Sequence, residues 1–185
     1  MATIKTDKTL TAFLDLIAVS EGTSSSPVTR ADGYDIIVSG IDGHHTFADY
    51  STHPFALGRK PIIVREGKPA EFYTPSDQPN AKPVEVKAAE PSLESTASGR
   101  YQIIWPTWAY LASKYMLECF SPINQDKAAL FLIQERHCEN IILSGNISEA
   151  VQTLSNIWAS FPGNLYNQGG HTVEELVNKY RTYLA

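Results

Sequence analysis

The sequence of 185 residues has few cysteines, no long apolar run and no excess of basic residues. Two cysteines, Cys119 and Cys138, are too few for the disulfide framework of a small secreted domain. We therefore expect reduced thiols, with a single bridge as the alternative. The longest apolar runs, such as residues 36–38, are far too short to cross a bilayer. A disulfide scaffold and a membrane-spanning helix are both excluded.

Acidic residues outnumber basic ones, 20 against 15, which gives a formal net charge of −5. A surface that follows a phosphate backbone needs an excess of Lys and Arg, so we expect no nucleic-acid partner. Residues 1–5 include a lysine, but no long apolar segment and no small-residue cleavage site follow them. Asp15 also interrupts the stretch 10–19. We therefore expect no signal peptide.

The proportions of hydrophobic residues (43%) and charged residues (19%) are those of a globular protein. We expect one domain over residues 1–185, since a chain of this length buries roughly 70% of its unfolded surface. The segment of about residues 54–92 differs, because it contains these prolines among the chain's 11: Pro54, Pro61, Pro69, Pro75, Pro79, Pro83 and Pro91. Such spacing excludes a helix. We predict a hairpin of residues 62–65 and 70–73 around Gly67, within an extended surface loop.

Apolar residues recur with helical spacing elsewhere in the chain. The first helix is predicted over about residues 9–21, with Gly22 placed to end it. Residues 34–38 have a strand pattern, and residues 46–48 are the expected partner strand. The fold class is therefore α+β, mostly helical, with a small β-hairpin region after the first helix. The later helices are predicted over about 106–120, over 122–138, from Ser148, and over 172–184, the last with a Thr172–Glu175 capping box.

Glu21 lies on the apolar face of the first predicted helix. At about 100° per residue, Glu21 falls roughly 20° from Leu10, in the middle of the apolar stripe. Asp15 falls at roughly 140° and is expected to be an ordinary solvated charge. Burial and the negative end of the helix would both raise the pKa of the Glu21 carboxyl. The alternative is a helix-end glutamate that has rotated into water.

A glutamate that is protonated near neutral pH is suited to donate a proton to a glycosidic oxygen. Glycoside hydrolysis usually needs a second carboxylate, and Asp35, at the start of the predicted strand, is the candidate. We favour the local interpretation of Asp35, in which it accepts hydrogen bonds from nearby backbone N–H groups. Glu21 is therefore the candidate catalytic acid, with or without a carboxylate partner.

Several motifs, in order along the chain, resemble the phage lambda endolysin family. None is specific alone, but together they cover most of residues 10–55 and 93–166. They are Ala12-Phe13-Leu14-Asp15 with Ser20-Glu21-Gly22-Thr23, the segment Gly33–Val38, Asp49-Tyr50-Ser51 with His53-Pro54, the segment Ser95–Gln102, and Ser155–Ser160 with Pro162-Gly163. The Pro-rich segment departs from the family pattern by its greater length.

The resemblance implies a lysozyme-like fold and cleavage of the MurNAc–GlcNAc β-1,4 bond of bacterial peptidoglycan, with Glu21 as the acid and base. It further implies lytic transglycosylation, in which the MurNAc 6-hydroxyl attacks and a 1,6-anhydro product forms. No cofactor is implied. The resemblance also implies a protein that stays in the host cytoplasm until another phage protein permeabilises the membrane, and then lyses the host cell at its wall.

The same resemblance makes Tyr101 and Gln102 candidate substrate-binding residues. Tyr101 offers a flat apolar face and a hydroxyl, and Gln102 offers an amide that both donates and accepts. Asp35 is a further candidate, and Ser155 and Asn156 are expected to reach the cleft from their helix. Structural or solvated positions are the alternatives for all of them.

No metal site is expected, because the spacing of the histidines His44, His45 and His53 does not match that of zinc ligands. The last predicted helix carries Lys179 and Arg181 beside an apolar stripe. We favour packing of this stripe onto the core over a weak contact with an anionic membrane. A monomer is expected. Two other functions remain open: a hydrolytic muramidase that uses Glu21 with Asp35, and a glycan-binding module without turnover.

Overall fold

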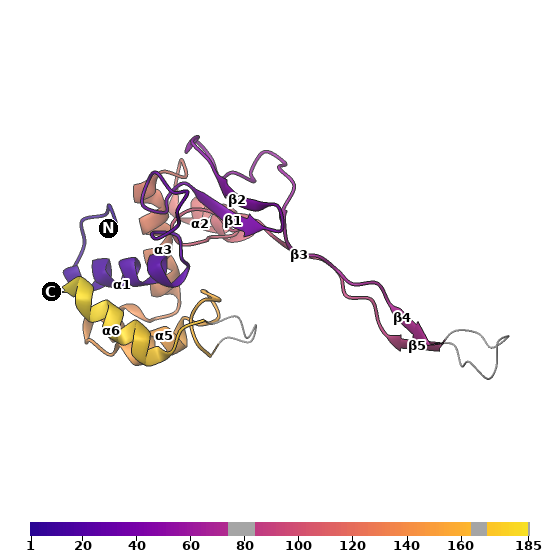
Figure 1. Ribbon diagram of the computed structural model, residues 1–185. Coiled ribbons are helices and arrows are strands. Elements are labelled where there is room, and N and C mark those ends of the chain that lie inside the picture. The colour runs from indigo at the N-terminus through magenta and orange to yellow at the C-terminus, as the bar shows by residue number, and fades with distance from the viewer. Residues whose placement is uncertain (74–83, 164–169, 185) are drawn as a thin grey trace.

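The computed structural model describes residues 1–73, 84–163 and 170–184 (Figure 1). It shows a mostly helical body from which a thin two-stranded arm projects. The elements are α1 (Lys8–Ser20), β1 (Ile36–Gly40), β2 (Gly43–Thr46), β3 (Ile62–Arg65), β4 (Glu71–Tyr73), β5 (Val84–Lys87), β6 (Leu93–Ser95), α2 (Trp105–Tyr115), α3 (Pro122–Glu135), α4 (Glu139–Leu143), α5 (Ile147–Thr153) and α6 (Val173–Leu184).

Local capping signals place the ends of the first and last helices. Asp7 is the N-cap of α1 and accepts a hydrogen bond of 2.8 Å from the backbone N–H of Thr9. Gly22 follows α1 with a φ of +70°, the left-handed conformation predicted for it. At α6, the predicted capping box forms, because Thr172 and Glu175 exchange backbone-to-side-chain hydrogen bonds.

Helix α1 is the centre of the core rather than a surface helix. Phe13, Leu14, Leu16 and Ile17 have no exposed surface, although they point in different directions around the helix. Helix α6 lies alongside α1, and both chain ends lie at this side of the body (Figure 1). The prediction that Asp15 is solvated is wrong, since its side chain is only 5% exposed. The periodicity argument placed Asp15 on the outer side of α1, but there its carboxylate is covered by the backbone N–H of Ala2 and by Arg100.

Two predicted helices end earlier than expected. The helix predicted over 106–120 is α2 and ends at Tyr115, because Met116 adopts a left-handed φ of +53°. The helix predicted over 122–138 is α3 and ends at Glu135, and His137 is left-handed. The short helix α4 that follows was not predicted. Single left-handed residues other than Gly and Asn stop these helices, and they have no clear signal in the sequence.

The Pro-rich segment forms a long arm instead of a loop with a local hairpin. Strand β3 pairs with β6, and β4 pairs with β5, both antiparallel. The hairpin predicted around Gly67 is therefore wrong. A Cβ at Gly67 would lie 2.5 Å from the carbonyl oxygen of Glu90, so Gly67 allows the two arm strands to approach closely. The stretch 74–83, with three of the predicted-loop prolines, lies outside the described residues.

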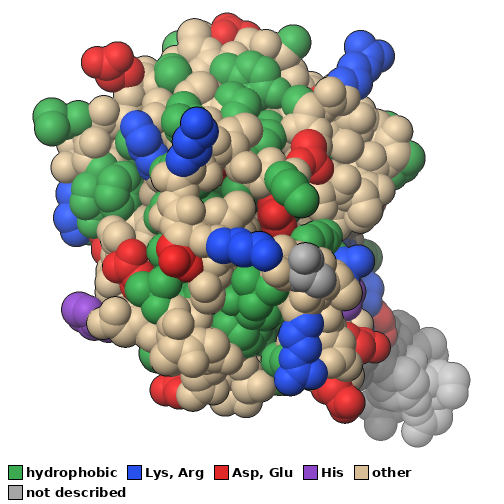
Figure 2. Space-filling model, turned by 90° about the vertical axis from the view of Figure 1, so that its left-hand side faces the viewer, with side chains coloured by type: hydrophobic (Ala, Val, Ile, Leu, Met, Phe, Trp, Pro, Cys, Tyr) green, Lys and Arg blue, Asp and Glu red, His purple; other side chains and the backbone are tan. Residues whose placement is uncertain are grey.

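The apolar stripe of α6 faces the core, as the sequence favoured. Leu176 and Tyr180 are nearly fully buried, and the rings of Tyr180 and Phe13 pack edge to face. On the face with the chain ends, Lys and Arg side chains are interspersed with Asp and Glu (Figure 2). In the described ranges, no helix is both long and apolar enough to cross a membrane. A membrane contact through α6 stays an untested prediction.

Candidate active site

Glu21 is the C-cap of α1 and lines a hollow of about 410 Å³, called here the Glu21 hollow. Strand β1 contributes Val38, and the base of the arm contributes Val64, Leu93 and Glu94. Opposite the arm, residues 157–159 complete the wall. The half-buried Glu21 side chain therefore lies between the helical body and the small β-region.

The carboxyl group of Glu21 is held by a short chain of hydroxyls. Ser160 donates a hydrogen bond of 2.7 Å from its Oγ to Glu21 Oε1, and Ser20 donates one of 2.8 Å to Ser160 Oγ. Burial raises the pKa of the Glu21 carboxyl, and the hydrogen bonds from Ser160 offset part of this rise. The carboxyl therefore tends to keep its proton at a higher pH than a free glutamate does.

Gln102 lies on the turn that faces Glu21. Its backbone has a φ of +48°, an uncommon conformation for a residue other than glycine, and its Nε2 donates a hydrogen bond of 3.0 Å to the Gly99 carbonyl oxygen. Gly99 must be glycine, because a Cβ there would lie 2.1 Å from Oε1 of Gln125. That same Oε1 accepts the backbone N–H of Arg100 at 2.9 Å. The turn is thus clamped to α3, with Gln102 turned toward the hollow.

A buried polar network holds the turn that carries Gln102 against the core. Arg100 Nη2 donates to Asp15 Oδ1 at 2.8 Å, and Arg100 Nη1 lies 2.9 Å from Asp32 Oδ2. The hydroxyl of Tyr101 donates to Asp126 Oδ1 at 2.6 Å, and the Tyr34 hydroxyl bonds to the same oxygen. Asp15 and Arg100 therefore form a buried ion pair, whereas the sequence predicted Asp15 as a solvated charge.

Tyr101 does not present the flat face that the sequence suggested. The ring of Tyr101 lies in the core and has no exposed surface, and its hydroxyl donates to Asp126. The backbone carbonyl oxygen of Tyr101 accepts a hydrogen bond of 3.0 Å from Trp158 Nε1. Tyr101 therefore shapes the groove wall through its backbone. A ring platform for sugar stacking at this position is excluded by the burial of the ring.

Asp35 and Ser155 are not brought to Glu21. The buried Asp35 carboxylate accepts hydrogen bonds from Thr29 Oγ1 and, at 2.8 Å, from the backbone N–H of Arg30. This is the local role that the sequence favoured, and it removes Asp35 as a partner for Glu21. Ser155 donates to the Gln152 carbonyl oxygen at 2.8 Å and lines a separate small hollow. The predicted cleft position of Ser155 is wrong, because α5 ends at Thr153 and turns this residue inward.

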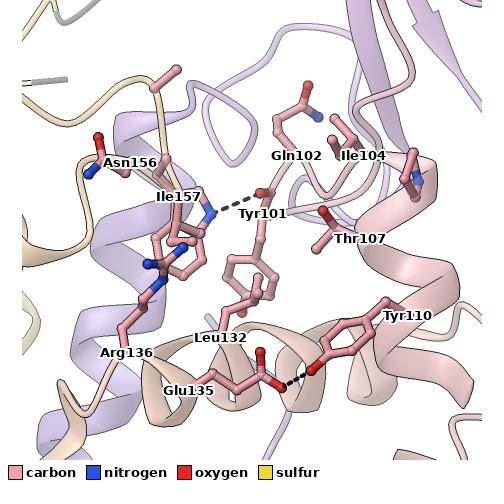
Figure 3. Close-up of a pocket in the computed structure, with 13 residues that line it drawn as sticks. Tyr101, Gln102, Ile104, Thr107, Tyr110, Leu132, Glu135, Arg136, Asn156 and Ile157 are labelled. Carbon is pink, nitrogen blue, oxygen red and sulfur yellow. Dashed lines mark hydrogen bonds between the residues drawn. The ribbon is translucent and has the colours of Figure 1, made fainter. Parts of the chain in front are cut away.

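A second hollow, of about 500 Å³, continues the groove between α2, the end of α3 and residues 156–159 (Figure 3). We call it the Arg136 hollow. Asn156 lines it, so this predicted residue does reach the groove. The two hollows share the lining residues Gln102, Ile104, Ile157, Trp158 and Ala159. A third, smaller hollow contains both Glu21 and Gln102, so a continuous groove passes these two residues.

Sequence reasoning missed Ser160, which bonds Glu21, and the groove residues Glu94 and Arg136. Ser160 lay within the motif Ser155–Ser160, so attention to that motif alone could have found it. Glu94 is an exposed residue of β6 that reaches the Glu21 hollow only because β6 pairs with β3. No local signal marks it.

The three histidines considered for a metal site point to different partners. His44 bonds Ser39, His45 bonds Asp42, and His53 is buried against the Ile103 carbonyl. Across residues 1–73, 84–163 and 170–184, no group of three or more His, Cys, Asp or Glu side chains is placed to hold a metal ion. Cys119 and Cys138 are free thiols, as favoured by the sequence.

Residues 11–185 match the protein family described as Endolysin. The chain belongs to the endolysin family. The endolysin of Escherichia phage P2 is 40% identical over 183 residues, which cover 98% of this chain and 96% of that protein. The endolysin of Escherichia phage lambda is 36% identical over 171 residues, which cover 92% and 87%.

Solved structures agree with this assignment. The lysozyme of bacteriophage lambda complexed with a chitohexasaccharide has a TM-score of 0.72 and 34% identity, over 98% of this endolysin and 97% of that chain. A further lambda lysozyme structure has a TM-score of 0.68 and 31% identity over the same shares. The lysozyme-like α+β fold is confirmed, and so is the predicted activity: this endolysin is a glycosidase that cleaves bacterial peptidoglycan.

Proposed function

We propose that this endolysin cleaves the MurNAc–GlcNAc β-1,4 bond by lytic transglycosylation, with Glu21 as both general acid and general base. The observation that carries this proposal is the state of Glu21. Its carboxyl lies in the groove, burial raises its pKa, and Ser160 holds one oxygen at 2.7 Å. A carboxyl that keeps its proton is what a glycosidic leaving oxygen needs.

The reaction needs no water. Glu21 gives its proton to the glycosidic oxygen as the bond to MurNAc C1 breaks, so GlcNAc leaves with a free 4-hydroxyl. The 6-hydroxyl oxygen of the same MurNAc then forms a bond to C1, and its proton passes to the Glu21 carboxylate. The 1,6-anhydro ring is complete and Glu21 is protonated again. One carboxyl that first donates and then accepts a proton is sufficient.

The groove provides room for a glycan strand on both sides of Glu21. Gln102 lines all three hollows, and its amide offers hydrogen-bonding groups to sugar hydroxyls and acetamides. The chitohexasaccharide complex of the similar lambda lysozyme supports a glycan as occupant. We assign Gln102 to glycan binding, and Asn156, which also lines the groove, to substrate binding in the neighbouring Arg136 hollow.

Hydrolysis is the second candidate, and one observation favours it. Glu94 lines the same hollow as Glu21, is exposed, and is therefore a candidate base to activate a water molecule. The hydrolytic reaction leaves a reducing MurNAc end. Mass spectrometry of digested sacculi separates the two reactions, because the anhydro product lacks one water. Loss of activity in Glu94→Gln together with reducing ends would replace transglycosylation by hydrolysis.

The decisive variant is Glu21→Gln, which keeps the shape and removes the proton donor. We expect the rate of sacculus solubilisation to fall about 10²–10⁴-fold, the usual contribution of a general acid. Glu94→Gln is the matched control and should stay within about threefold of the parent, with anhydro ends. Turnover by Glu21→Gln at the parent's rate would refute the role of Glu21. A parent that binds sacculi without turnover would indicate a glycan-binding module instead.

A stability measurement on Glu21→Gln tests the burial separately from catalysis. The folded protein holds the Glu21 proton more tightly than the unfolded chain, where the pKa is about 4.5, so folding stability falls as the pH rises from 4.5 through the raised pKa. We therefore expect Glu21→Gln to be more stable than the parent toward urea at pH 7 and equal to it near pH 4. Equal stability at both pH values would show that the carboxyl is freely solvated.

A further inference from the structure

The Arg136 hollow continues the groove beyond the catalytic centre, and the proposed reaction makes no use of its charged groups. It is larger than the Glu21 hollow, about 500 Å³ against 410 Å³, and shares five lining residues with it. A glycan bound across Glu21 therefore has its next sugars, and anything attached to them, at this hollow. Two charged side chains line it, Glu135 and Arg136.

The charge of Glu135 is already balanced within the protein. Lys114 Nζ lies 2.8 Å from Glu135 Oε1, and the hydroxyls of Tyr110 and Tyr115 donate to the same oxygen at 3.1 Å and 2.9 Å. The hydrogen bond from Lys114 is the main reason that the pKa of Glu135 lies below its usual value. This carboxylate is a fixed, satisfied part of the wall and does not attract a cationic ligand.

The charge of Arg136 is not balanced in this way. Arg136 follows the last residue of α3, is exposed, and forms no ion pair with any side chain in the described part of the molecule. Figure 3 shows its side chain extending from the end of α3 toward Ile157, on the same side of the hollow as Asn156. A guanidinium and an amide thus face one hollow, in a protein whose net charge is −5.

The two parts of peptidoglycan differ in charge. The glycan backbone offers hydroxyls and acetamides, whereas the peptide stem that is attached to the lactyl group of MurNAc carries carboxylates. A guanidinium binds a carboxylate through two parallel hydrogen bonds, and an amide side chain matches peptide N–H and C=O groups. The unpaired charge at the groove wall therefore fits the stem better than the sugar.

We propose that Arg136, with Asn156, binds a carboxylate of the peptide stem next to the cleaved bond, so that this endolysin prefers glycan strands that carry acidic stems. This proposal rests on peptidoglycan cleavage at the groove of Glu21. It assigns Arg136 a role in substrate specificity and none in proton transfer. Because the protein is acidic overall, the positive charge of Arg136 also provides a local site that attracts an anionic polymer.

The test compares two soluble substrates that differ only in stem charge. Peptidoglycan strands are first acetylated at their free amines, and half are then amidated at their carboxyls with carbodiimide and ammonia. We expect the parent to have a kcat/KM about tenfold lower on the amidated strands, the loss of one charge-assisted interaction. Arg136→Gln should match the parent on amidated strands and lose about tenfold on charged strands. Arg136→Lys should lie between them.

Arg181→Gln is the matched control, because it removes the same charge from α6, outside the groove, and should behave as the parent does. An equal loss by Arg136→Gln on both substrates would overturn the proposal and indicate a sugar contact. No loss on either substrate would overturn it as well. The end groups of the products are read in the same samples. Reducing ends would overturn transglycosylation and leave the stem preference measurable, so the two failures are distinguishable.

Discussion

The body and the arm of this endolysin both contain ion pairs, but the pairs lie in opposite surroundings. In the body, Arg100 and Asp15 are 2.8 Å apart, with side chains 2% and 5% exposed. In the arm, Lys87 and Glu71 are 3.8 Å apart, with side chains 46% and 63% exposed. Both pairs join a basic and an acidic side chain, but one is shielded from water and the other is largely exposed to it.

The buried pair has a structural consequence that the exposed pair lacks. Arg100 belongs to the turn that carries Gln102 into the groove, so its interaction with Asp15 fixes a groove residue. Removing one partner of a buried pair leaves an uncompensated charge in the interior, which is strongly destabilising. Exposed pairs are screened by water and contribute little. Three variants, ordered by expected effect, test this comparison.

Asp15→Asn should have the largest effect. It leaves the buried Arg100 with Asp32 as its remaining carboxylate partner and weakens the acceptor for the Ala2 backbone N–H. We expect the free energy of unfolding to fall by about 3 kcal/mol, the lower end of the range for a broken buried pair. Urea unfolding at pH 7 measures this. A change no larger than that of an arm variant would show that the pair is solvated.

His53 should give a comparable effect, but only in acid. Its ring is buried among Phe55, Trp105 and Phe120, and Nε2–H donates to the Ile103 carbonyl oxygen at 3.0 Å. Burial, only partly offset by this hydrogen bond, lowers the pKa of His53 from 6.5 to about 4. The folded protein then binds fewer protons than the unfolded chain, so stability is lost as the pH falls from 6.5 to 4.

This shift predicts a loss of about 3 kcal/mol of unfolding free energy between pH 7 and pH 4 that is due to His53. Urea unfolding across this range should show a shallower pH dependence in His53→Gln than in the parent. The exposed His137 is the matched control, and His137→Asn should keep the parent's slope. If His53→Gln does not fold, the titration of His53 in the parent by NMR replaces it, and a midpoint near 6.5 would refute the burial argument.

Glu71→Gln, in the arm, should have the smallest effect. It removes the ion pair with Lys87, which retains Glu90 at 3.6 Å. Because both side chains are largely exposed, we expect a change within the error of a urea unfolding curve, and full activity on sacculi. A loss as large as that of Asp15→Asn would mean that the arm is packed in solution, and would remove the contrast between the two regions.

Local sequence patterns predicted the helices better than the strands of this molecule. Asp7 and Gly22 bound α1 because a side-chain cap and a left-handed glycine act within a few residues. Gly67 also looked like a turn residue, but the arm strands pair across about thirty residues, and Gly67 serves their close approach. Pairing partners that lie far apart in sequence leave no local signal.

In the candidate site, too, local patterns predicted some residues, and contacts between distant parts of the chain decided the others. Glu21 was found from its position in the apolar stripe, and the structure places its carboxyl in the groove. The prediction of Asp15 as a solvated charge was wrong, because the Ala2 backbone N–H and Arg100, which comes from a distant turn, cover its carboxylate. Glu94 and Arg136 reach the groove only through the packing of β6 and α3, so helical periodicity could not identify them.

The sequence by itself determined where α1 begins and ends, which carboxyl lies on its apolar face, and which family of enzymes the chain resembles. These features depend on interactions within a few residues or on motifs read in order. Only the tertiary structure decided which charges are buried together, how the Pro-rich segment pairs, and which side chains line the groove with Glu21. The reason is physical: burial and long-range pairing depend on what surrounds a residue in space, and neighbours in the chain do not specify it.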